Sequence, residues 1–170
     1  MTNMDLTCRI SGGEAVALAR HTRSPEAVAE WVALLHSANA MEARNAAWVM
    51  THLADEQIVA LKPRQNEFID LIMHTQNTAL RRLVLNLVER QPMEEADLRT
   101  DFLDFCLEHM SLLDEPPGVQ TLCIKLAYRQ CRFYPELMQE FRTRLALMQE
   151  GYAKCVQSLL RKMMGTVTSD

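Results

Sequence analysis

Apolar residues recur along the chain with the spacing of one stripe on an α-helix. In the segment LRRLVLNLVER (80–90) they fall at i, i+3, i+4, i+7 and i+8, which is the register of an amphipathic helix. The register occurs four times, and each occurrence predicts a helix with one apolar face. Its members are Ala43, Ala46, Ala47, Met50 and Thr51; Leu80, Leu83, Val84, Leu87 and Val88; Val119, Leu122, Cys123, Leu126 and Ala127; and Tyr152, Cys155, Val156, Leu159 and Leu160.

A second helix is predicted before each of these four. Ser24 offers a cap and Pro25 a preset first turn, and Pro63 and Pro135 open later segments in the same way. The first helix of each pair is expected at about 25–37, 63–75, 95–113 and 135–149. The second is expected at about 40–53, 78–91, 118–131 and 152–164, and a shorter helix near 13–22 precedes all of them.

The stripes begin at residues 43, 80, 119 and 152, so they are separated by 37, 39 and 33 residues. Units of this length, each a helix pair that cannot bury its apolar face alone, indicate an α-solenoid. We therefore predict an all-α fold, an α-α superhelix of about four helix pairs. A single domain is expected over 1–170, with repeats at approximately 25–55, 63–92, 95–131 and 135–164.

The segments ARNAAWVMTHL (43–53) and LRRLVLNLVER (80–90) resemble the second helix of HEAT repeats, in which an apolar residue and an Arg precede small and leucine-type core positions. Arg44 and Arg81 match that Arg, whereas Gln120 and Ala153 stand there in the later repeats. The resemblance covers about 25–164 and is to the HEAT/armadillo-like superfamily. It implies a short right-handed α-solenoid that serves as a scaffold for other proteins.

Composition favours a globular, reduced protein. The chain has 170 residues, of which 48% are hydrophobic and 24% charged, so it can bury a core without a disulfide or a metal. Its five cysteines form no CxxC pair, and Cys123 and Cys155 lie on the apolar stripe, so we expect both to be buried. A cytoplasmic location is predicted, because the start of the sequence does not resemble a signal peptide and no apolar run is long enough for a membrane span.

No catalytic site is predicted. The sequence has no phosphate-cradling loop and no hydrolase elbow, and its histidines lack metal-ligand spacing. His36 and His74 each follow a helix-opening proline by 11 residues, which places them near helix C-termini, where polar groups are favoured. We therefore expect no enzyme activity, no cofactor and no metal.

Two further groups of residues have a structural and a functional interpretation. Asp97, Asp101, Asp104 and Glu108 recur at steps of 4, 3 and 4, so they are expected on one solvated helix face, with a basic partner or a divalent cation as alternatives. Trp31 is expected in the core and Trp48 partly exposed, the alternative being a stacking platform for a base or ligand.

Charge is separated between the two sets of helices. The first-helix segments (25–38, 63–76, 94–115 and 135–150) sum to −11, whereas the second-helix segments (40–53, 78–90, 119–132 and 152–164) sum to +8. The HEAT resemblance places second helices on a concave surface, which predicts a basic groove. A row of cations that take no part in core packing is expected there, with Tyr128 beside it. The cations are Arg82, Arg90, Lys125, Arg129, Lys154 and Lys162.

These features predict a non-enzymatic scaffold or adaptor that holds an acidic segment of a partner protein on its second helices. The alternative is a nucleic-acid-binding protein that resembles the HEAT-like DNA glycosylases, and the sequence pI of about 5.7 is evidence against it. Mutual attraction between the two helix sets is a weak reason for the asymmetry, because exposed ion pairs contribute only about 0–1 kcal/mol each.

Overall fold

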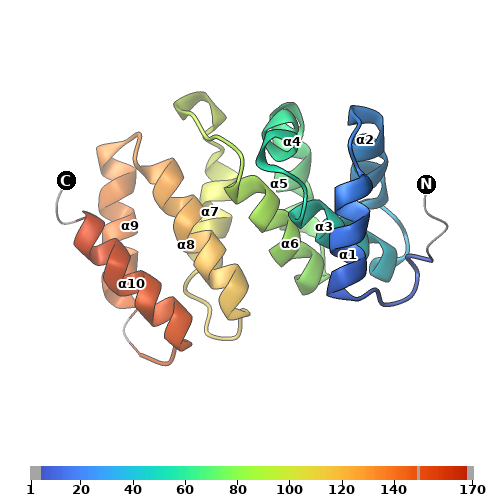
Figure 1. Ribbon diagram of the computed structural model, residues 1–170. Helices are drawn as coiled ribbons and strands as arrows, with labels where there is room; N and C mark the ends of the chain where they lie inside the picture. The colour runs from blue at the N-terminus through green and yellow to red at the C-terminus, as the bar shows by residue number, and fades with distance from the viewer. Residues whose placement is uncertain (1–4, 149, 168–170) are drawn as a thin grey trace. The chain divides into compact units, whose positions relative to one another are not determined.

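The computed structural model describes residues 5–148 and 150–167, and every regular element in this part of the chain is helical (Figure 1). The predicted all-α class is confirmed. The elements are α1 (Gly12–His21), α2 (Pro25–Leu34), α3 (Ala40–Thr51), α4 (Asp55–Ala60), the 3-10 turn η1 (Lys62–Arg64), α5 (Gln65–His74), α6 (Thr78–Glu89), the 3-10 turn η2 (Glu95–Asp97), α7 (Thr100–His109), α8 (Pro117–Cys131), α9 (Pro135–Leu147) and α10 (Lys154–Val167).

The chain divides into two compact units, Met1–Pro92 and Met93–Asp170. The division falls between the second and third predicted repeats. Helices α1 to α6 belong to the first unit and α7 to α10 to the second. The single domain expected over 1–170 stays a prediction.

The core of the first unit lies along α3 and α6, which pack against each other. Helix α2 packs on α3, α5 packs on α6, and α1 also contacts α3. The apolar stripe of α6 is buried along its whole length, and Ala46, Ala47 and Met50 of α3 are fully buried. The predicted stripes of these two helices are therefore the faces that join the repeats.

In the second unit α7, α9 and α10 all pack against α8. Phe102 of α7 and Phe141 of α9 are fully buried, as are Cys123 and Leu126 of the α8 stripe. Helix α8 is thus the central element of this core.

Asparagine caps begin both second helices of the first unit. The Oδ1 atom of Asn39 accepts hydrogen bonds from the backbone N–H groups of Met41 and Glu42, at 2.9 and 3.1 Å. Asn77 does the same for Leu80 at 3.1 Å. Because such caps satisfy N–H groups that have no partner within the helix, the two asparagines define where α3 and α6 start.

The prediction missed one helix and placed the starts of α5 and α7 too early. Helix α4 was not expected, and it lies against the core through the buried Ile58. Helix α5 begins at Gln65, because Pro63 lies in the separate turn η1. Helix α7 begins at Thr100 rather than near 95, because Arg99 is extended, with φ −120° and ψ 117°, and separates η2 from the helix.

Both tryptophans are half-buried. The prediction that Trp31 lies in the core was therefore wrong, and the prediction that Trp48 is partly exposed is confirmed. The indole Nε1–H of Trp31 donates to the Thr22 hydroxyl at 2.8 Å. A buried indole needs such a partner for its N–H, and this one holds the ring at the edge of the core.

Cys155 is exposed, which corrects the expectation that it is a core thiol. Helix α10 starts at Lys154, and its buried residues are Val156, Leu160 and Val167. Val156 and Leu160 belong to the predicted stripe, and Val167 continues it, so the buried face is the predicted one but narrower. Neighbouring residues lie about 100° apart around a helix, so Cys155 stands at the edge of this narrower face and is exposed.

Thiol labelling is expected to separate the cysteines into two classes. Cys8 and Cys155 are exposed and should react rapidly in the native protein, whereas Cys106, Cys123 and Cys131 are buried and should react only after unfolding. Burial raises the pKa of Cys131 to about 12 and that of Cys106 well above its usual range, so neither forms the reactive thiolate at neutral pH. Time-resolved titration with a chromogenic thiol reagent should therefore count two fast thiols, and rapid labelling of Cys123 would contradict the assigned core.

Candidate partner-binding surface

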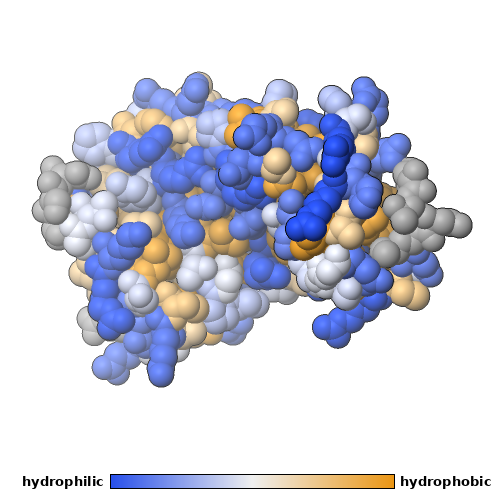
Figure 2. Space-filling model, in the orientation of Figure 1, coloured by the Kyte–Doolittle hydropathy of each residue, from blue (hydrophilic) through white to orange (hydrophobic). Residues whose placement is uncertain are grey.

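The seven residues predicted to bind a partner lie on α6, α8 and α10. In the first unit α6 carries Arg82, which is exposed, while half-buried Arg90 follows its last residue. In the second unit the residues are Lys125, Tyr128 and Arg129 of α8, which are half-buried, and Lys154 and Lys162 of α10, which are exposed. Figure 2 shows one largely hydrophilic face of the molecule, with hydrophobic residues visible between the polar side chains.

Arg90 has a structural duty, contrary to expectation. Its guanidinium donates to the carbonyl oxygens of Thr51 at 2.9 Å and Leu53 at 2.7 Å, and to Oδ1 of Asp55 at 2.6 Å. Only 21% of the side chain is exposed. Arg90 therefore joins the C-terminal end of α6 to the end of α3 and the start of α4.

Arg81 also stabilises the fold through hydrogen bonds. Its Nε donates to the carbonyl of Ile72 at 3.2 Å and its Nη2 to that of Thr75 at 2.6 Å, so the guanidinium closes the C-terminal end of α5. Carbonyl groups in the last turn of a helix lack intrahelical partners and favour a cation. This contact gives a physical reason for an Arg at this position of a HEAT-like second helix.

Arg44 stands at the same repeat position in α3 but is used differently. Its guanidinium lies over the Trp48 ring, 4.4 Å from the centroid, and Nη1 donates to Oδ1 of Asn45 at 2.8 Å. Partial burial lowers the pKa of Arg44, and the positive charges of Arg9 and Arg82 lower it further. Sequence reasoning missed this cluster because it treated Arg44 as a repeat-signature residue and did not consider Arg9.

The cations of the second unit are arranged in two groups. Lys154 and Lys162 are separated by eight residues and therefore lie on one side of α10, about two turns apart. Lys125 and Arg129 are separated by four residues and share a side of α8. Tyr128 packs towards α9, since its ring lies 6.1 Å from that of Phe141, and so it contributes to the core as well as to the surface.

The predicted acidic ladder is broken at its first member. Asp97 lies in η2, where its Oδ2 accepts from the backbone N–H of Glu94 at 2.8 Å, so it is not on the helix that carries the others. Asp101 pairs with Arg99 at 2.6 Å, and hydrogen bonding to Arg99 lowers the pKa of this carboxyl group. Asp104 and Glu108 are exposed. Among the described residues no three His, Cys, Asp or Glu side chains form a group suited to a metal ion.

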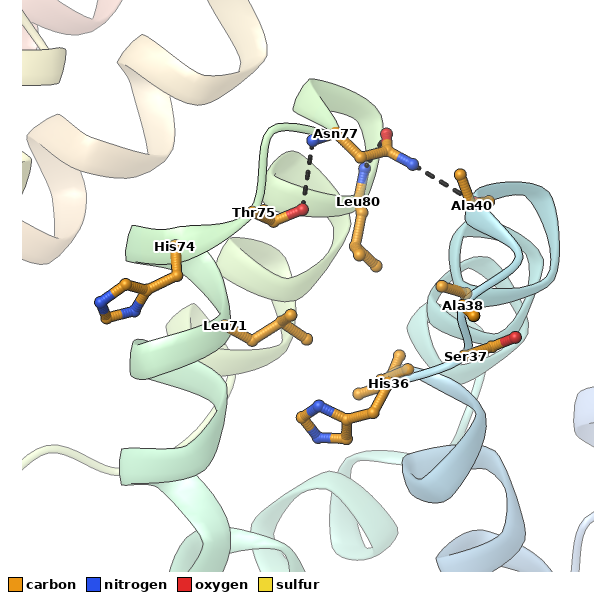
Figure 3. A pocket seen from close by; sticks show the side chains of 11 residues that line it. His36, Ser37, Ala38, Ala40, Leu71, His74, Thr75, Asn77 and Leu80 are labelled. Atoms are coloured by element: carbon orange, nitrogen blue, oxygen red, sulfur yellow. Dashed lines mark hydrogen bonds between the residues drawn. The ribbon is translucent and has the colours of Figure 1, made fainter.

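A pocket of about 340 Å³ in the first unit lies between the ends of the first helices and the starts of the second (Figure 3). His36 contacts Glu67 through Nε2 at 2.7 Å, and Nδ1 of His74 lies 2.7 Å from the carbonyl oxygen of Asp70. Asn77 donates from Nδ2 to the carbonyl of Ala40 at 3.3 Å. Both histidines lie near helix C-termini, as predicted; the His74 contact is within α5, whereas those of His36 and Asn77 join neighbouring helices.

Within the described ranges, the structure contains no helix with the length and apolar content needed to span a bilayer.

A family of HEAT repeat domains matches residues 2–167 of the chain. No curated protein and no solved structure matches it. The pairing of α2 with α3, α5 with α6, α7 with α8 and α9 with α10 agrees with the helix-pair organisation of such repeats. The match spans almost the entire sequence, and the protein is therefore a member of the HEAT repeat family, whose architecture is the predicted α-solenoid.

Proposed function

We propose that the protein is a non-enzymatic scaffold whose second helices hold an acidic segment of a partner protein. HEAT repeats generally serve as scaffolds for protein interactions. The observation that carries the proposal is the exposure of Arg82, Lys154 and Lys162, whose side chains make no ion pair within the described part of the chain. Cations without a structural duty are available to a ligand.

The distribution of charge supports an anionic partner. The second-helix segments are net positive although the whole chain has a formal net charge of −4. A local excess of one sign attracts the opposite charge and raises the rate of encounter with it. The acidic total favours a protein segment over a nucleic acid, because nucleic-acid-binding domains are generally basic.

A cytoplasmic location is part of the same proposal. It is supported by five cysteines that are all free thiols, three of them buried, since proteins of oxidising compartments usually pair their cysteines.

Charge reversal at the three exposed cations is expected to abolish partner capture. The variant Arg82→Glu/Lys154→Glu/Lys162→Glu should fold with a nearly unchanged melting temperature, because none of these side chains is buried. Affinity capture from native cell extract, followed by mass spectrometry, should recover a partner with the wild-type protein that the variant does not recover. Added salt should weaken the wild-type complex in parallel.

The control is Arg20→Glu/Arg23→Glu, which also lowers the net charge but at exposed positions outside the proposed surface. It should retain capture. Undiminished capture by the triple variant would refute the proposed surface. Loss of capture after nuclease treatment would identify the ligand as a nucleic acid instead of a protein.

A further inference from the structure

Three arginines, Arg9, Arg44 and Arg82, stand on neighbouring segments of the first unit, and the positive charges of Arg9 and Arg82 both act on Arg44. Arg44 lies on α3 and Arg82 on α6, and these two helices pack together. Arg9 belongs to the segment before α1. That segment is tied to α3 by Asn45, whose Nδ2 donates to the carbonyl oxygens of Leu6 at 2.9 Å and Cys8 at 2.7 Å.

The guanidinium of Arg44 is held in a defined orientation. The Trp48 ring supports one face, and Asn45 accepts a hydrogen bond from Nη1. A guanidinium carries five N–H donors, so most of those of Arg44 have no partner among the described residues. Gly12 at the start of α1 lies against the same indole, since a Cβ atom built on it would be 3.8 Å from Cζ2 of Trp48.

A purely structural role does not account for this arrangement. Arg81 occupies the equivalent repeat position and uses its donors on two helix-end carbonyls, whereas Arg44 makes no such contact among the described residues. The charges that act on the pKa of Arg44 are those of Arg9 and Arg82, and both are positive. Like charges held together destabilise the folded state unless an anion joins them.

We propose that Arg9, Arg44 and Arg82 bind a phosphomonoester dianion carried by the partner segment. The planar fork of a guanidinium matches two phosphate oxygens, and three guanidinium groups match a dianion better than a single carboxylate. A phosphorylated Ser, Thr or Tyr supplies this group on a protein. The inference rests on the proposed function only for the source of the anion, because the site itself can be tested with small molecules.

The site is tested by calorimetric titration at pH 7.5 and constant ionic strength. The probes are inorganic phosphate, acetate, O-phosphoserine, a Gly-Ser peptide with one phosphoserine, and the same peptide with Glu in its place. Phosphate and phosphoserine should bind saturably and acetate should not, and the phosphopeptide should bind at least about tenfold more tightly than both the Glu peptide and free phosphoserine. Trp48 should report the same event by a change in emission in a Trp31→Phe background.

Arg44→Gln and the pair Arg9→Gln/Arg82→Gln should each weaken phosphopeptide binding at least about tenfold, in variants whose circular dichroism shows the helical fold of the wild type. The matched control is Arg23→Gln, an exposed arginine outside the cluster, and it should bind as the wild type does. Equal responses to phosphate and acetate, or equal losses in the control, would overturn the site. A phosphopeptide that binds no more tightly than free phosphoserine would overturn its assignment to a partner segment. Failure of the capture experiment alone would refute the proposed scaffold function and leave the anion titration standing.

Discussion

Replacing Leu87 with alanine is expected to lower the free energy of unfolding by about 3–5 kcal/mol. Leu87 is 0% exposed and lies on the stripe of α6, which packs against both α3 and α5. The substitution removes transfer free energy and leaves a cavity between helices that also hold the rest of the core, so the site can collapse only in part. Urea unfolding followed by circular dichroism measures the change directly.

Three other leucines provide a comparison for this result. Leu122 of α8 is 9% exposed, so Leu122→Ala should cost less, about 2–3 kcal/mol. Leu113 is 64% exposed, and Leu113→Ala should stay within about 0.5 kcal/mol of the wild type. Leu83, which is also buried, should behave like Leu87. A loss below about half a kcal/mol for Leu87→Ala would mean that the stripe does not form the core.

Removing the guanidinium of Arg90 is expected to cost about 2–4 kcal/mol. Arg90→Ala leaves the carbonyl oxygens of Thr51 and Leu53 without their donor and removes the ion pair with Asp55. Hydrogen bonds to charged groups are stronger than neutral ones, and two carbonyls at the end of α3 lose theirs together. The melting temperature should fall markedly, contrary to the expectation that Arg90 could be reversed without a structural effect.

Arg82→Ala is the matched control, because it removes the same side chain from an exposed position of the same α6 region. It should change the unfolding free energy by less than about 0.5 kcal/mol. Arg90→Lys should recover only part of the loss, since one ammonium group cannot reproduce a planar fork that reaches three oxygens. Equal effects of Arg82→Ala and Arg90→Ala would show that the contacts of Arg90 contribute nothing to stability.

The local sequence pattern was sufficient to predict most of the helices and most of the core. The stripe of α6 from Leu80 to Val88 was predicted residue by residue, because helical periodicity is a property of neighbours within two turns. The start of α2 followed from Ser24, whose hydroxyl accepts from the N–H of Ala27 at 3.1 Å. The start of α7, which has no side-chain cap, was placed too early, and at α10 the buried face is narrower than the predicted stripe, so Cys155 is exposed.

The candidate site depended on contacts that no local pattern contains. Arg44 and Arg81 stand at one repeat position, yet Arg81 donates to helix-end carbonyls while Arg44 lies over an indole, where the charges of Arg9 and Arg82 act on it. The carbonyls that engage Arg90 lie 37 and 39 residues away in the chain. The sequence by itself thus determined most of the helices and the apolar face of each second helix in the first unit. Only the tertiary structure decided which cations serve the fold and which face solvent, because the partners of a long side chain come from whichever helices pack beside it.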